Sequence, residues 1–236
     1  MRPWFPLVEP TPRWVRVRLG GELVADSRRA LLHIAYGPGD LPRSFLPTYY
    51  VPGEDVRPGV LVDEAVDDAG ATTWTVAVGD RRVESGAWMH RSPPPALDWF
   101  EEDEPLVAHA RDPHTRVDVA PSSRHVRVEL DGHLLAESTR PTLLFETTLP
   151  VRYYLPREDV AAELLPTATS TICPYKGVAS WWSVRVGDRV VEDLVWSYPT
   201  PIAENPRIAG LMCFYNEKVD LVVDGERQER PVTPWS

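Results

Sequence analysis

The sequence predicts a mainly β protein made of two small antiparallel domains in tandem, with little helix. Three observations lead to this expectation. Blocks of sequence from the first half of the 236-residue chain recur in the second half. Within those blocks apolar and polar residues alternate, which is typical of half-buried strands. The 25 prolines interrupt the chain too often for long helices.

The repeat is the strongest of these signals. Several blocks match in the same order, with small insertions and deletions between them, which indicates a duplication. The matching blocks are residues 13–27 with 124–138, 49–56 with 153–160, 74–80 with 182–188, and Trp88 with Trp196.

The boundary between the copies is expected where turn-forming residues cluster, from Arg111-Asp112-Pro113 to Pro121-Ser122-Ser123. The sequence therefore predicts a first repeat, with an N-terminal extension, over residues 1–111. A linker follows over residues 112–121, and the second repeat covers residues 122–236.

Each repeat opens with a strand whose valines share one face, followed by a turn. Gly20-Gly21 and Asp131-Gly132 suit two-residue hairpin turns, which need positive φ. A second hairpin is expected around Gly79-Asp80 and, in the other copy, around Gly187-Asp188. Large aromatic residues dominate small cores, so the tryptophans that recur in register are expected to pack there: Trp74, Trp88, Trp182 and Trp196.

One short helix is expected over residues 156–165. Proline is favoured in the first turn of a helix, as at Pro156, and Pro166 would end the helix.

Composition excludes several classes of protein. A net charge of −10 and a pI near 5.1 argue against nucleic acid as a partner. No apolar run approaches the ~18 residues of a membrane span, and the N-terminus lacks the pattern of a secretory signal, so a soluble, cytoplasmic protein is expected. Cys173 and Cys213 are the two cysteines, and they are expected to be free thiols. Without CxxC pairs, no structural zinc site is predicted.

The two copies diverge where a site would lie. Residues 171–181 of the second copy include Cys173-Pro174-Tyr175-Lys176-Gly177, whereas residues 63–73 of the first carry none of these reactive groups. Glu146 likewise falls opposite Ala35. A requirement of folding alone would act on both copies, so the sequence predicts a site in the second repeat, on a turn shaped by proline and glycine.

Lys176 and Cys173 are the candidate catalytic residues. The chain has 25 basic residues, of which Lys176 and Lys218 alone are lysine. A lysine in so arginine-rich a chain suggests a compact phosphate contact or an amine that loses its proton, and the alternative is a solvated surface residue. Cys173 is either a nucleophile assisted by Lys176 or a small buried residue.

Other polar residues complete the expected site. Glu146 and Asp159 could bind a cation, accept a proton or pair with Lys176. Arg140, Tyr154 and Tyr198 would join them in a polar pocket. For Trp182 and Trp196, ligand stacking is the alternative to core packing.

These motifs together resemble a bacterial family, the domain of unknown function numbered 427. The resemblance rests on Tyr153–Val160, Cys173–Gly177, Trp182–Asp188 and Trp196–Pro199. It implies a compact all-β domain similar to β-tent, or Mss4-like, folds, sometimes in tandem, under a provisional nucleotidyltransferase-type label and without an established activity. The paired CxxC zinc motifs of other β-tent domains are missing here. The residues that match the family pattern are Glu146, Tyr154, Asp159, Cys173, Tyr175, Lys176, Trp196 and Tyr198.

Three functions follow as hypotheses. In the first, the second repeat binds a polar or anionic metabolite or nucleotide, and the first repeat packs against it as a degenerate partner in a pseudo-dimer. In the second, the chain is a nucleotidyl- or other group-transfer enzyme that uses Lys176, Cys173 or a carboxylate. In the third it is an interaction scaffold that uses sheet edges or the acidic run at residues 101–104. No cofactor is indicated.

Overall fold

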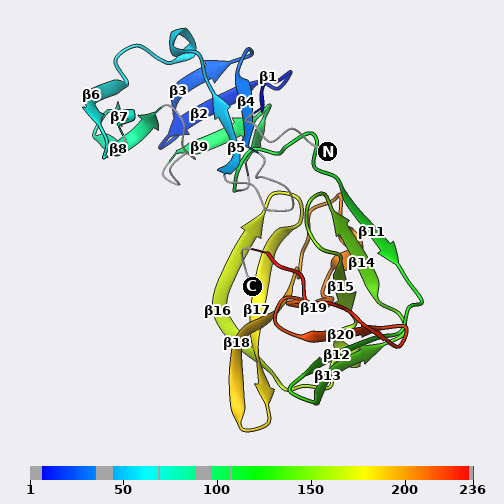
Figure 1. The fold of residues 1–236 in the computed structure, drawn as a ribbon. Coiled ribbons are helices and arrows are strands. Elements are labelled where there is room, and N and C mark those ends of the chain that lie inside the picture. The colour runs from blue at the N-terminus through cyan, green and yellow to red at the C-terminus, as the bar shows by residue number, and fades with distance from the viewer. Residues whose placement is uncertain (1–6, 36–44, 69, 89–96, 107, 234–235) are drawn as a thin grey trace. The chain divides into compact units, whose positions relative to one another are not determined.

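The computed structural model describes residues 7–35, 45–68, 70–88, 97–106, 108–233 and 236, and it divides into two compact units, Met1–Asp112 and Pro113–Ser236. Both units consist of antiparallel strands (Figure 1), and the helices of the described residues are single 3₁₀ turns. The mainly β, tandem architecture predicted from the sequence is confirmed. None of these helices has the length and apolar character needed to cross a membrane.

The first unit contains three sheets, with strand orders β1-β4-β5, β10-β9-β2-β3 and β6-β7-β8. The 3₁₀ turn η1 (Gly53–Asp55) connects the first sheet to the third. The strands are β1 (Leu7–Pro10), β2 (Val15–Leu19), β3 (Glu22–Ser27), β4 (Leu31–Ala35), β5 (Phe45–Tyr50), β6 (Leu61–Val66), β7 (Thr72–Val78), β8 (Arg81–Trp88), β9 (Asp98–Glu101) and β10 (Glu104–Pro105).

The second unit contains two sheets. A seven-stranded sheet has the order β11-β14-β15-β19-β18-β17-β16, and a four-stranded sheet has the order β13-β12-β20-β21. Its 3₁₀ turns are η2 (Arg157–Asp159) and η3 (Pro206–Ile208). The strands are β11 (Val117–Pro121), β12 (Val126–Leu130), β13 (His133–Ser138), β14 (Thr142–Glu146), β15 (Arg152–Leu155), β16 (Leu164–Cys173), β17 (Gly177–Val186), β18 (Arg189–Ser197), β19 (Met212–Phe214), β20 (Asp220–Val223) and β21 (Glu226–Arg227).

The predicted hairpin turns are confirmed. Gly20 and Gly21 join β2 to β3 with φ of 58° and 88°, and Asp131 and Gly132 join β12 to β13 with φ of 51° and 78°. Positive φ at both turn residues matches the right-handed twist of the flanking strands. Each unit therefore has, after its first short strand, the hairpin that its turn dipeptide specifies.

Alternation along the strands of the seven-stranded sheet produces two separate cores, because successive side chains point to opposite faces. One face carries Trp182, Leu155 and Phe214, which pack with the four-stranded sheet. The other face carries Trp181 and Tyr154 in a second cluster with Trp196, Tyr198 and Cys213. Trp182 and Trp196 thus both pack into cores, but on opposite faces. The side chain of Trp88 lies outside the described residues.

The prediction of a linker over residues 112–121 is wrong for its second half. Val117–Pro121 is strand β11, which pairs along its whole length with β14 of the second unit. The first unit has the same arrangement, since β1 pairs with β4. The Val-Asp-Val alternation at residues 117–119 is too short to outweigh the turn formers on either side of it, and pairing with β14 supplies the strand conformation.

The predicted helix over residues 156–165 is also wrong. One 3₁₀ turn forms at Arg157–Asp159, and strand β16 already begins at Leu164. The backbone N–H groups of Ala161 and Ala162 both donate to the carbonyl of Leu135, at 2.9 and 3.0 Å. These amides are therefore committed to a neighbouring strand and cannot continue a helix.

The repeats differ in how their hairpins are joined. In the second unit β19 pairs with both β15 and β18, which makes one continuous sheet. In the first unit β5 and β8 belong to separate sheets, and no described strand lies between them. The sequence explains the difference, because Trp88 and Asp98 correspond to Trp196 and Asp220, so that the first copy has a much shorter segment there.

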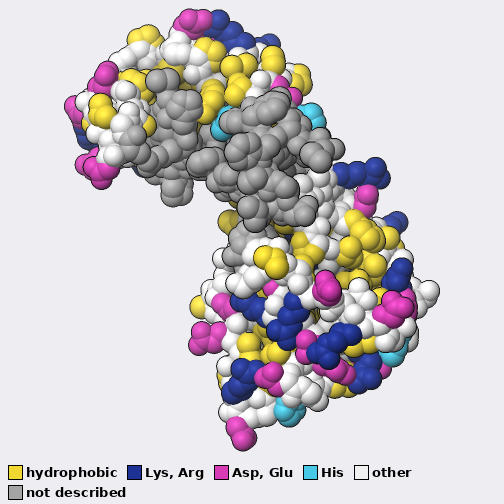
Figure 2. Space-filling model, in the orientation of Figure 1, with side chains coloured by type: hydrophobic (Ala, Val, Ile, Leu, Met, Phe, Trp, Pro, Cys, Tyr) yellow, Lys and Arg dark blue, Asp and Glu magenta, His cyan; other side chains and the backbone are white. Residues whose placement is uncertain are grey.

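Charges of both signs are interspersed on the visible surface of the second unit (Figure 2). Many form exposed pairs, such as Arg185 with Glu163 at 2.7 Å and Arg124 with Asp224 at 2.8 Å. Exposed pairs of this kind contribute little to stability. Charged groups that are buried are therefore the informative ones.

Candidate functional site

The predicted turn at residues 173–177 is present. Cys173 ends β16, Gly177 begins β17, and these two residues are paired in register. The Lys176 N–H donates to the Cys173 carbonyl at 3.2 Å. Gly177 has a φ of 107°, and a Cβ there would lie 3.3 Å from the Thr200 carbonyl oxygen. Glycine is needed because another segment of backbone crosses the turn at close range.

That segment, residues 199–211, is called the strap below. The Ile202 N–H donates to the Lys176 carbonyl at 3.1 Å, and the Asn205 side-chain amide donates to the Tyr175 carbonyl at 2.6 Å. The Gly210 N–H returns to the Tyr198 carbonyl at 3.0 Å. The strap therefore covers the turn through backbone contacts, and Lys176 is buried.

Lys176 forms an ion pair with Glu146, the last residue of β14. Its Nζ lies 2.6 Å from Oε2 of Glu146, and each side chain is 10% exposed. Burial lowers the pKa of Lys176, but attraction to Glu146 and contact with the Cys173 side chain outweigh it, so the pKa lies above its ordinary value. The side chain is an ammonium ion, which cannot act as a nucleophile.

An aromatic cluster lies beside this pair. The Trp196 indole N–H donates to the Tyr154 hydroxyl at 3.1 Å, and the Trp196 ring centroid is 5.4 Å from Trp181 and 5.0 Å from Tyr215. Burial raises the pKa of both Tyr154 and Tyr198, and the neighbouring acidic group of Glu146 adds to the effect. Both phenols therefore stay neutral and are available to donate or accept hydrogen bonds.

The two thiols differ in their surroundings. Both are free. Cys213 is fully buried in this cluster, and burial raises its pKa to about 12. Cys173 is part-exposed and packs at the edge of the cluster, next to Lys176. Of the two, Cys173 is the thiol that a small molecule could reach.

A second buried ion pair was not anticipated from the sequence. Both terminal nitrogens of Arg152 bond to the two carboxylate oxygens of Glu217 at 2.7 Å, and the guanidinium carbon lies 5.5 Å from the Trp196 ring. Thr233 also donates to Glu217 at 2.7 Å. Burial opposes ionisation of Glu217, but the bonds from Arg152 and Thr233 hold its pKa below the ordinary value. Thr48 stands opposite Arg152 in the first copy, so the comparison of repeats contained the signal.

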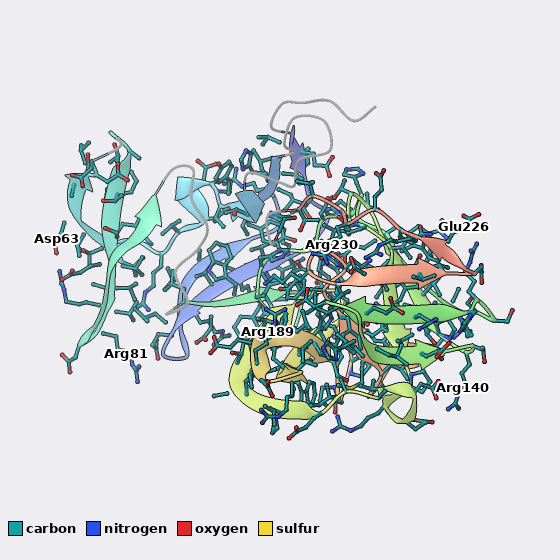
Figure 3. The ribbon with its side chains drawn as sticks, turned by 60° about the horizontal axis from the view of Figure 1, so that its bottom comes forward. Asp63, Arg81, Arg140, Arg189, Glu226 and Arg230 are labelled. Atoms are coloured by element: carbon teal, nitrogen blue, oxygen red, sulfur yellow. The ribbon has the colours of Figure 1, made fainter. Side chains whose placement is uncertain are left out.

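Arg140 and Asp159 are not brought into this group. Ser138 donates to Asp159 at 2.7 Å, and Arg140 bonds Asp159 at 3.1 Å and Glu158 at 2.9 Å. Figure 3 shows Arg140 at the rim of the second unit. The same arrangement occurs in the first unit among Ser27, Arg29 and Asp55. Because both repeats contain this serine–aspartate–arginine clip, it belongs to the fold.

The remaining expected site residues are placed as follows. Trp182 lies on the opposite face of the sheet, with the Arg157 guanidinium 5.7 Å from its ring. Tyr175 is part-buried in the turn. Glu146, Tyr154, Cys173, Lys176, Trp196 and Tyr198 form one neighbourhood. The described residues contain no group of three or more His, Cys, Asp or Glu side chains placed to hold a metal ion.

The first repeat has a different surface at the matching position. The carboxylate of Glu64 accepts from the Trp74 indole at 3.2 Å, and Asp63 pairs with Arg82. Asp63 and Arg82 are largely exposed, with side-chain exposures of 64% and 54%. The buried ammonium–carboxylate pair is thus a property of the second repeat among the described residues.

Fold and site together define a tandem pair of antiparallel β domains in which one copy has buried charges beside aromatic side chains. The chain belongs to the family called domain of unknown function 427 (DUF427), whose model matches residues 7–110 and again residues 118–225. A search of curated proteins finds no match to the chain. The family resemblance noted from the sequence is confirmed over both repeats.

Proposed function

We propose that the second repeat binds a small polar or anionic metabolite, such as a nucleotide, at the Lys176–Glu146 pair. The supporting observation is that this pair is buried beneath the strap in one repeat and has no counterpart in the other. We further propose that the protein works in the bacterial cytoplasm, as the sequence suggests.

Energetics support a role for the pair beyond folding. Removing each charge from water costs several kcal/mol, and replacement of a buried pair by apolar residues is often neutral or stabilising. The first repeat keeps the strand orders β1-β4-β5 and β6-β7-β8, the counterparts of β11-β14-β15 and β16-β17-β18, without such a pair. Selection for stability alone gives no reason to retain Lys176 and Glu146 together.

The geometry suggests how a ligand would bind. An anionic group that reaches Lys176 would replace or share the Glu146 carboxylate as the acceptor for the ammonium. Charge-assisted hydrogen bonds of this kind are shorter and stronger than neutral ones. The neutral hydroxyls of Tyr154 and Tyr198 would supply further donors, and the strap would have to move to admit the ligand.

Calorimetric titration tests this proposal. Nucleotides and phosphorylated sugars are titrated into the wild-type chain and into the double variant Glu146→Ala/Lys176→Met, which leaves no unpaired buried charge. Lys218→Met is the matched control, because Lys218 is the other lysine and is exposed. We expect saturable binding to wild type and Lys218→Met, weakened at least about tenfold in the double variant.

Two outcomes contradict the proposal. Failure of every compound to bind the wild-type chain contradicts ligand binding itself. Equal affinity of the wild type and the double variant contradicts the location of the site.

A group-transfer enzyme is the second candidate, and the position of Cys173 supports it. The part-exposed thiol lies next to the Lys176 ammonium, and catalytic cysteines are found in such partly exposed sites beside a positive charge. Intact-mass analysis after exposure to nucleotides would reveal an adduct on wild type that is missing from Cys173→Ala. Lack of any adduct and unchanged turnover in Cys173→Ala would exclude covalent catalysis by this thiol. The scaffold hypothesis stays a prediction.

A further inference from the structure

The first repeat contains an apolar pocket of about 580 Å³. Its walls come from β2, β3, β5, β6, β7, β8 and β9 and from the segment that follows β5. Aromatic rings contribute much of the lining, including Tyr49, Trp74 and Trp99. The described residues that line the pocket all have uncharged side chains.

The matching region of the second repeat is solid core. Val17, Val76 and Ala87 of the pocket correspond to Val128, Val184 and Val195, which all belong to one buried cluster. At the position of Gly86 the second repeat has Leu194, which is fully buried. A Cβ on Gly86 would lie 2.8 Å from the Val83 carbonyl oxygen, so the first repeat cannot hold a larger side chain there as it is packed.

Two further side chains fill that core in the second repeat. Met212 and Phe214 of β19 are 1% and 2% exposed and belong to the same cluster. The shorter segment between Trp88 and Asp98 leaves no described strand of the first repeat in that role. The pocket therefore follows from specific sequence differences between the repeats.

Trp99 lines the pocket with its ring, and its indole nitrogen is covered by neighbouring atoms. The buried Nε1–H has no hydrogen-bond acceptor among the described residues. Buried donors are nearly always paired in folded proteins, and an unpaired one costs about 1–3 kcal/mol. The matching residue of the second repeat is Leu221, so this donor is a feature of the copy with the pocket.

We propose that the first repeat binds a small uncharged molecule that combines apolar, aromatic-sized surface with one hydrogen-bond acceptor. Ligand pockets have volumes of about 300–1,000 Å³ and are mostly apolar with few polar groups, and this pocket fits that description. An uncharged ligand suits the described lining, which supplies no counter-charge for a buried ion. Because the Trp99 nitrogen is covered, the indole ring has to turn before its N–H can bond to the acceptor of the ligand. This site is independent of the Lys176–Glu146 site.

Two neutral fluorescent probes test the proposal on the full chain. Prodan carries a ketone acceptor, and N-phenylnaphthylamine lacks one. We expect both to bind wild type saturably at one site. Ala87→Trp, which fills the pocket from β8, should weaken both at least about tenfold. Val66→Trp is the matched control, because Val66 is 69% exposed on β6 and does not line the pocket.

Trp99→Phe tests the acceptor separately. It keeps a ring in the wall but removes the donor, so prodan affinity should fall about fivefold while N-phenylnaphthylamine affinity stays unchanged. If Ala87→Trp shifts the unfolding midpoint, Val51→Phe fills the pocket from the end of β5 and provides the same comparison.

Three results would overturn the proposal. In the first, neither probe binds the wild-type chain saturably. In the second, a folded variant with a filled pocket binds both probes as tightly as the wild type does. In the third, Trp99→Phe weakens the binding of both probes equally, which would eliminate the acceptor bond.

Discussion

The two repeats share a plan and differ in one connection. Both have the opening hairpin, the serine–aspartate–arginine clip and a bulge with positive φ in the late hairpin, at Ser85 and at Asp193. The second repeat adds the strap and β19, which unite its hairpins into one sheet. The first repeat has a shorter connection and an apolar pocket. The repeat with the strap and β19 has a full core, and the repeat with the shorter connection has an apolar pocket among its described residues.

The largest expected effect comes from the buried pair that the first repeat lacks. Arg152→Met leaves Glu217 unpaired in the interior and should destabilise the second unit by about 3–5 kcal/mol. The transition of the first unit should not move. Urea unfolding followed by tryptophan fluorescence measures both.

Arg185→Met is the control for that substitution, because Arg185 pairs with Glu163 on the surface. If Arg152→Met shifts the midpoint no more than this control does, the pair is not structural.

The next largest effect is the loss of stability on truncating a core leucine, compared between the full core of the second unit and the core with a pocket in the first. Leu194→Ala should cost the second unit about 3 kcal/mol, because the fully buried side chain leaves a cavity. Leu97→Ala in the first unit should cost nearer about 2 kcal/mol, since Leu97 already borders open space. Denaturant midpoints of the two variants provide the test, and a larger loss for Leu97→Ala would contradict the comparison.

A smaller effect separates folding from function at the Lys176 site. In the double variant Glu146→Ala/Lys176→Met, residue 146 becomes alanine, which is the residue at the matching position 35 of the first repeat. Stability should change by less than about 1 kcal/mol, because the cost of burying both charges disappears with their attraction. Thermal unfolding measures the change in stability. A loss of several kcal/mol would show that the pair is needed for folding.

The clip should behave alike in both repeats. Ser138→Ala and Ser27→Ala each remove one buried hydroxyl donor to an aspartate, a bond that contributes about 1 kcal/mol. Each unfolding transition should fall by a similar amount in its own variant. A loss confined to Ser138→Ala would return Asp159 to the list of candidate site residues.

Acidification should produce the smallest difference in stability between the two units. Glu217, Asp159 and Asp55 all have pKa values below their ordinary values in the folded chain. Their contribution is present above the unfolded pKa and is lost as the pH falls through the folded pKa. Below about pH 4.5 the second unit should lose stability faster, because Glu217 has no counterpart among the described residues of the first. Urea midpoints measured from about pH 6 to about pH 3 test this, and parallel losses would contradict it.

Much of the fold and part of the site could be predicted from the sequence. The turn at residues 173–177, with Cys173 and Lys176, was located by comparing the copies, and Glu146 was found in the same way. Arg152 shows the same asymmetry, but it stands beside a tyrosine block that both copies share. The shared block makes the position look like part of the common fold. The likeness to β-tent domains stays a prediction.

The sequence by itself determined what depends on neighbours along the chain: the repeat, the two-residue alternation of the strands and the turns that need positive φ. The tertiary structure decided which side chains meet. Lys176 reaches Glu146 across 30 residues, and Arg152 reaches Glu217 across 65. Such contacts depend on strand register and on the path of the strap, and both are set by packing between distant segments. For the same reason, only the folded chain shows a pocket where the shorter copy lacks a strand.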